Sequence, residues 1–77
     1  MKVTLKIMGP AKRNIPENPS TLDLPDECKV IDMMISLGYT DLEARRFTYV
    51  RQGIALRPAD VLAEGDLVQA VLQMGGG

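Results

Sequence analysis

The sequence predicts a single α+β domain in which a mixed sheet of four or five strands wraps around one main helix. Three observations support this fold class. The chain has 77 residues, which is the size of one small domain. It begins with a segment of regular apolar–polar alternation, which is typical of a half-buried strand. One segment of helical periodicity follows, and further segments rich in strand-forming residues come after it.

The first predicted strand covers residues 2–8, and its two faces differ in polarity. Val3, Leu5 and Ile7 alternate with polar side chains, so they are expected to face the core. Residues 10–19 contain three prolines and are predicted to form a loop. A second short strand is expected directly after that loop. It covers residues 21–24, with Leu22 and Leu24 directed inward.

The main helix is predicted to start at Pro25-Asp26. Asp26 is the expected N-cap, and Glu27 is favourable in the first turn because of the helix dipole. Gly38 follows the last apolar residue and is expected to end the helix. A spacing of 100° per residue places the apolar side chains on one face. These residues are Val30, Ile31, Met34, Ile35 and Leu37.

The part of the chain after the helix contains strand and turn signals. Thr40-Asp41-Leu42-Glu43 has the spacing of a capping box, which predicts a short second helical turn. Strands are expected at 46–51 and 54–56, with a hairpin turn at Gln52-Gly53 between them. A tight turn at Glu64-Gly65-Asp66 then leads to the last strand, residues 67–73. The order ββαββ around one helix is that of the β-grasp, with residues 1–73 as the domain and residues 74–77 as a flexible tail.

Composition excludes several classes of function. A net charge of −1 argues against a nucleic-acid module, which would show a basic excess. The chain has no histidine and one cysteine, so neither a zinc site nor a histidine-based catalytic triad is expected. No catalytic residues, bound cofactor or metal are therefore predicted. No apolar run is long enough for a membrane span, and a cytoplasmic location is expected.

Several charged or reactive side chains have structural explanations. The acidic residues around the helix suit capping and a solvated face. Cys28 is interpreted as a small residue at the margin of the core. The second half of the chain carries four arginines, most of them expected on a solvated sheet face and one or two as candidates to meet an acidic partner surface. They are Arg45, Arg46, Arg51 and Arg57.

The C-terminal residues carry the functional signal. The chain ends Met74-Gly75-Gly76-Gly77, and glycine at these positions has no side chain to bury and costs the most backbone entropy to order. A glycine tail is thin and flexible, so it can enter a channel too narrow for a Cβ atom. A terminal carboxylate is ionised at neutral pH and needs activation, most simply as an acyl-adenylate formed from ATP by a partner enzyme.

The chain resembles the ThiS/MoaD family of ubiquitin-like sulfur carriers in thiamine and molybdopterin biosynthesis. The resemblance rests on the order of the elements, on the terminal Gly-Gly, and on a Leu-x-x-Gly-Asp-x-Val motif. The motif residues here are Leu62, Gly65, Asp66 and Val68. The resemblance implies that an E1-like adenylyltransferase activates the terminal carboxylate with ATP. A sulfur donor of the cysteine desulfurase or rhodanese type then forms a thiocarboxylate, which passes sulfur to an acceptor biosynthetic enzyme.

The same resemblance implies specific roles for the tail. Gly77 would bear the thiocarboxylate with Gly76 completing the motif, or Gly76 would be reactive after trimming. Gly75 and Met74 would thread into the partner. Alternation in the last strand places Leu67 and Val71 on the open sheet face as a candidate partner interface. Two alternatives remain open: a ubiquitin-like modifier joined to other proteins through its terminal glycine, and a non-covalent β-grasp interaction domain.

Overall fold

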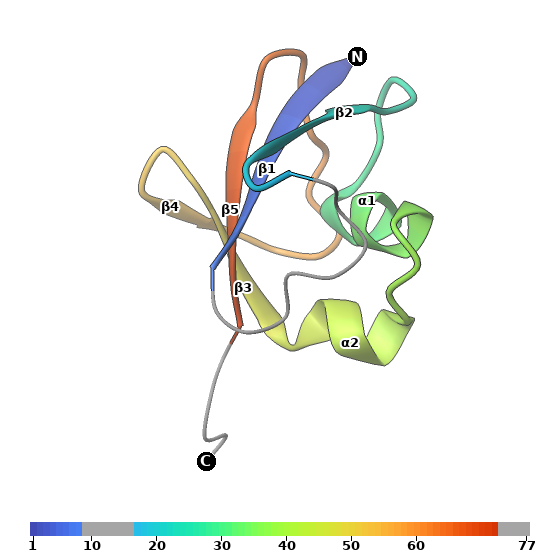
Figure 1. The fold of residues 1–77 in the computed structure, drawn as a ribbon, viewed down its shortest axis with the longest axis vertical. Helices are drawn as coiled ribbons and strands as arrows, with labels where there is room; N and C mark the ends of the chain where they lie inside the picture. Colours follow the sequence, from blue (N-terminus) through green and yellow to red (C-terminus); the bar gives the residue numbers. More distant parts are fainter. Residues whose placement is uncertain (9–16, 73–77) are drawn as a thin grey trace.

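The computed structural model describes residues 1–8 and 17–72 and contains five strands and two short helices (Figure 1). In chain order they are β1 (Lys2–Met8), β2 (Ser20–Asp23), α1 (Val30–Ser36), α2 (Asp41–Arg45), β3 (Phe47–Arg51), β4 (Ile54–Leu56) and β5 (Leu67–Leu72). The strands form one sheet in the order β2-β1-β5-β3-β4. The central strands β1 and β5 are parallel, and the other neighbouring strands are antiparallel.

The two helices lie on one side of the sheet, and no other described segment covers the opposite side (Figure 1). The predicted β-grasp is thus confirmed: a mixed five-stranded sheet is covered by α1, with α2 as a short addition. Because β1 and β5 are parallel neighbours, the chain between them must cross from one end of the sheet to the other. The helices and the β3–β4 hairpin lie within that crossing segment.

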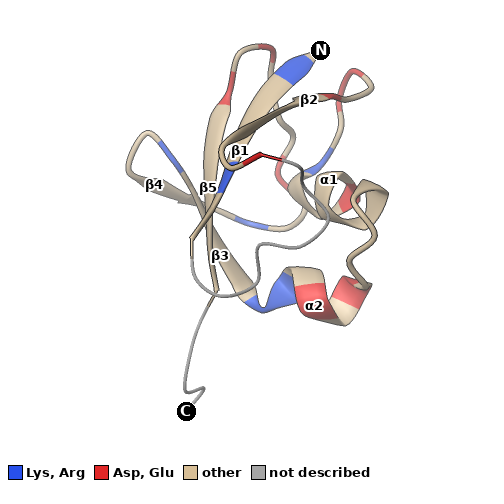
Figure 2. Cartoon of the chain, viewed as in Figure 1, with Lys and Arg blue, Asp and Glu red and all other residues tan. Residues whose placement is uncertain are grey.

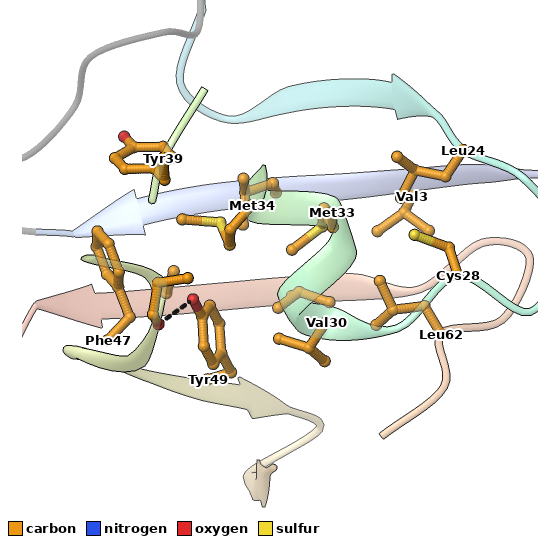
Figure 3. Close-up of a cluster of buried hydrophobic side chains, with 14 of the residues drawn as sticks. Val3, Leu24, Cys28, Val30, Met33, Met34, Tyr39, Phe47, Tyr49 and Leu62 are labelled. Carbon is orange, nitrogen blue, oxygen red and sulfur yellow. Dashed lines mark hydrogen bonds between the residues drawn. The ribbon is translucent and has the colours of Figure 1, made fainter. Parts of the chain in front are cut away.

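The hydrophobic core lies between α1 and the inner face of the sheet (Figure 3). The inward residues of β1 are fully buried as predicted, and Val68 and Ala70 of β5 are buried beside them. Val30, Met33 and Met34 of α1 pack against this layer. Full burial of a side chain of this size stabilises the folded state by about 1.5–3 kcal/mol relative to exposure. Burial at these positions therefore fixes which face of the sheet the helix covers.

The start of α1 differs from the prediction. The helix begins at Val30 with Lys29 as N-cap, so Asp26 is not the N-cap and Glu27, at φ 64°, precedes the first turn. The loop before β5 supplies the missing acceptors. The Val30 N–H donates to the Asp60 carbonyl oxygen and the Ile31 N–H to that of Pro58, both at 3.0 Å. Long-range backbone acceptors thus replace the local side-chain cap that the sequence predicted.

The buried face of α1 is also narrower than predicted. Ile35 was expected on the apolar face but is 46% exposed, whereas Met33 is fully buried. Because α1 has only seven residues, its contact with the sheet is limited to about two turns. Ile35 falls outside that contact, and Ile31 and Leu37 are partly buried at its edge.

The turns and the second helix agree with the sequence. Gly38 has φ 96° directly after the α1 C-cap, and α2 begins with the full capping box between Thr40 and Glu43. The β3–β4 hairpin turns at Gln52 and Gly53, both with positive φ. Two strands differ from the prediction by one residue. β2 covers 20–23 instead of the predicted 21–24, and β3 begins at Phe47 because Arg46 is the C-cap of α2. Residue 73 and most of the predicted 10–19 loop lie outside the described residues.

Replacing Gly65 is expected to test the turn before β5. Gly65 has φ +82°, and an added Cβ would meet no atom within 4 Å, so Gly65→Ala introduces backbone strain without a clash. A left-handed conformation costs a residue with a Cβ roughly 1–2 kcal/mol. We expect a loss of that size in the free energy of unfolding, measured by urea denaturation. Gly65→Asn should lose less, since asparagine tolerates this conformation. Equal stability of Gly65→Ala and wild type would contradict this reading of the turn.

Candidate functional site

The candidate site is the end of the sheet at which β5 finishes. β5 is the middle strand, flanked by β1 and β3, and its last described residue is Leu72 (Figure 1). The predicted tail residues Met74, Gly75, Gly76 and Gly77 lie outside the described residues. Their roles stay predictions, and the structure defines the surface from which they continue.

The turn that leads into β5 is held by the motif that the sequence singled out. Leu62 and Val68 are buried, and Gly65 supplies the positive φ of the turn. Asp66 accepts hydrogen bonds at Oδ2 from the Arg51 guanidinium at 2.7 Å and from the Ala63 N–H at 2.8 Å. The Asp66 side chain is only 15% exposed, so salt in the solvent weakens this ion pair less than it would weaken an exposed pair. The motif therefore fixes where β5 starts and how it is aligned with β3.

The outer face of the sheet carries an exposed apolar surface beside β5. Leu67 and Val71 are 52% and 37% exposed, which confirms that both face away from the helices. Met8 of β1 is 41% exposed and lies opposite Val71 in the strand register. We call Met8, Leu67 and Val71 the outer-face patch. Met8 was not among the predicted interface residues, although the alternation of β1 places it on the same side as Lys2, Thr4 and Lys6.

The described residues contain no cluster suited to metal chemistry. Within residues 1–8 and 17–72, no three His, Cys, Asp or Glu side chains are grouped so that they hold a metal ion. Neither α1 nor α2 is long and apolar enough to cross a membrane. No chemical step is assigned to a side chain here. Met8 and Val71 of the outer-face patch lie at the end of the sheet where the described part of β5 finishes, and Leu67 lies on the same face at the start of β5.

Cys28 is expected to be unreactive in the folded protein. Its side chain is buried at the margin of the core, as predicted, and its Sγ donates to the Lys29 carbonyl oxygen at 3.4 Å. Burial raises the pKa of the thiol above its ordinary value of 9.0, and the Asp32 carboxylate raises it further. Because the thiolate is the reactive form, alkylation at pH 8 should be much slower in folded than in urea-unfolded protein. Equal alkylation rates in the two states, followed by mass spectrometry, would contradict the burial of Cys28.

Comparison with known proteins shows a likeness in fold but not in sequence. No protein-family model matches the chain, and no curated protein matches it in sequence. The structure is similar to SAMP1 from Haloferax volcanii, with a TM-score of 0.72, 18% identity and full coverage of both chains. A second crystal structure, of H. volcanii small archaeal modifier protein 1, gives a TM-score of 0.70 and 17% identity over 92% of this chain and 95% of that one. The chain therefore has the ubiquitin-like β-grasp fold.

Proposed function

We propose that this protein is a ubiquitin-like carrier whose C-terminal glycine carboxylate is activated by an E1-like adenylyltransferase. The observation that carries the proposal is the run Gly75-Gly76-Gly77, which follows the central strand of a β-grasp sheet within five residues of Leu72. Residues 1–73 serve as the folded domain that the enzyme recognises. Residues 74–77 serve as the flexible tail that enters it, with Met74 and Gly75 in the threading segment.

The chemistry is divided between the two proteins. The terminal carboxylate attacks the α-phosphorus of ATP, which forms the acyl-adenylate and releases pyrophosphate. The partner holds the carboxylate in line with the phosphate, and the carrier supplies a narrow backbone without Cβ atoms. The described part of the carrier is assigned no acid or base in this step. Its contribution is recognition, through the outer-face patch and the end of the sheet where the described part of β5 finishes.

The product that we favour is a thiocarboxylate. The outer sulfur of a persulfide on a donor of the cysteine desulfurase or rhodanese type attacks the acyl carbon and displaces AMP, which carries away one carboxylate oxygen, so that an acyl disulfide forms. A thiol of the donor system then attacks the donor's sulfur in this disulfide, which breaks the S–S bond, releases the thiocarboxylate and leaves a disulfide between the two thiols. Gly77 bears the thiocarboxylate, or Gly76 does after removal of Gly77. An acceptor enzyme of thiamine or molybdopterin biosynthesis then receives the sulfur. The family resemblance of the Leu62–Val68 motif and of the glycine tail supports this assignment.

A protein-modifier function is the second candidate. It is favoured by the structural likeness to a protein that is named a small archaeal modifier protein. In this case a lysine amine of a target protein, rather than a persulfide, displaces AMP and forms an isopeptide bond. Both candidates share the adenylation step and differ only in the nucleophile that follows it.

The shared step is tested by ATP–pyrophosphate exchange. The purified protein is incubated with the E1-like adenylating enzyme of the same organism, ATP and labelled pyrophosphate. We expect exchange that depends on the carrier and saturates with it. Absence of exchange above the background of the enzyme alone would contradict the proposal. Recovery of the protein bound covalently to others in a cell extract would favour the modifier over the sulfur carrier.

A further inference from the structure

Charged side chains are paired at the end of the sheet where β5 begins. Lys2 Nζ lies 2.9 Å from Asp23 Oδ1 on the neighbouring strand, and the Arg51–Asp66 pair lies at the same end. By alternation and register, Asp23 is the one acidic residue that the described strands place on the outer face. At this end of the sheet, Lys2 and Arg51 are each paired with a carboxylate of the same chain.

Two cations toward the opposite end have no acidic partner within residues 1–8 and 17–72. Lys6 alternates with the buried Leu5 and Ile7, so it lies on the outer face, two residues before Met8. Arg46 is exposed and directly precedes Phe47, which lies opposite Leu72 in the register. The register therefore places it beside the residue at which the described part of β5 ends. Figure 2 shows basic residues at the α2–β3 junction.

The other three arginines among the described residues differ from Arg46 because each has a carboxylate partner. Arg45 lies 2.6 Å from Asp41, Arg51 lies 2.7 Å from Asp66, and Arg57 lies 3.1 Å from Asp60. Arg46 is thus the arginine of the described chain left available for a partner protein.

The apolar pair of Met8 and Val71 lies between these two cations. Met8 follows Lys6 on β1, and Val71 is opposite Thr48, which is two residues after Arg46 on the other side of β5. An apolar centre with charge at its rim is the usual anatomy of a protein interface. Here both rim charges have the same sign.

We propose that Lys6 and Arg46 dock against an acidic surface on the activating enzyme, beside the mouth of the channel that receives the tail. This inference rests on the proposed function. Residues 73–77 span at most about 17 Å when extended, so an enzyme that encloses the last glycines must contact this end of the sheet. Acidic groups at the channel mouth steer the carrier to it and reject carriers with acidic residues at these positions.

The test compares charge reversals in the ATP–pyrophosphate exchange assay. Lys6→Glu and Arg46→Glu are the test variants. Lys29→Glu is the matched control, because Lys29 is exposed, has no acidic partner in the described chain and lies at the start of α1, on the helix side. Each substitution changes the net charge by the same amount. Thermal unfolding followed by circular dichroism checks that every variant is folded.

The expected result is a rise in the KM for the carrier of about tenfold for Lys6→Glu and for Arg46→Glu, with little change in kcat. Lys29→Glu should stay close to wild type, and added salt should raise the wild-type KM more than that of the test variants. Equal effects of all three substitutions, or no effect of Lys6→Glu and Arg46→Glu, would overturn this docking inference but leave the proposed function standing. A wild-type protein that supports no exchange would overturn the proposed function as well.

Discussion

A variant that lacks Gly76 and Gly77 is expected to lose all measurable activation by the E1-like enzyme while it keeps its fold. Adenylation requires the carboxylate to reach the α-phosphate, and removal of two extended residues withdraws it by about 7 Å. Among the described residues, the buried core lies between Val3 and Ala70, and Leu72 is the last side chain packed against it. The free energy of unfolding should therefore change by less than about 0.5 kcal/mol. Pyrophosphate exchange and urea denaturation measure the two effects.

Deletion of Gly77 alone serves as the control for this truncation. If Gly77 is the reactive residue, the shorter tail should lose most of the exchange activity. If trimming normally exposes Gly76, the same variant should be fully active, which settles the position of the reactive glycine. Exchange at the wild-type rate by the protein that lacks both residues would show that the enzyme does not act on this terminus.

The double variant Leu67→Gln/Val71→Thr is expected to weaken recognition by the activating enzyme without unfolding the protein. Both side chains are partly exposed on the outer face, so burying their remaining area against a partner contributes about 1 kcal/mol each. The sum of about 2 kcal/mol corresponds to a rise of roughly 30-fold in the KM for the carrier. The kcat should change little, since neither side chain belongs to the tail.

Leu42→Gln is the matched control for that double variant. Leu42 is 63% exposed, more than either residue of the pair, but it lies on α2 on the helix side of the sheet. Its replacement should leave the KM close to that of wild type. A double variant with wild-type KM would show that the outer-face patch is no part of the recognised surface.

The features that local sequence predicts well are those that depend on neighbouring residues. The alternation of β1, the capping box of Thr40 and Glu43, and the turn at Gln52-Gly53 are all present as predicted. In each case the sequence pattern and the structural constraint lie within a few residues of each other. Alternation also placed Leu67 and Val71 on the correct face of β5.

The features that the sequence did not predict depend on contacts between distant segments. The start of α1 is set by the carbonyl groups of Pro58 and Asp60, which lie about thirty residues further along the chain. Asn18 is a second example, because its side chain exchanges hydrogen bonds with the Ile7 backbone at 2.9 and 2.7 Å. The place of Met8 beside Val71 follows from the parallel β1–β5 register.

Activation of the C-terminal glycine is tested most directly by the intact mass of the carrier after reaction with the E1-like enzyme, ATP and sulfide. We expect a mass increase equal to one sulfur replacing one oxygen, which fragmentation places on the last glycine. The same reaction without ATP provides the control. If the carrier keeps its original mass while the enzyme thiocarboxylates another ubiquitin-like carrier under the same conditions, the proposed function is wrong.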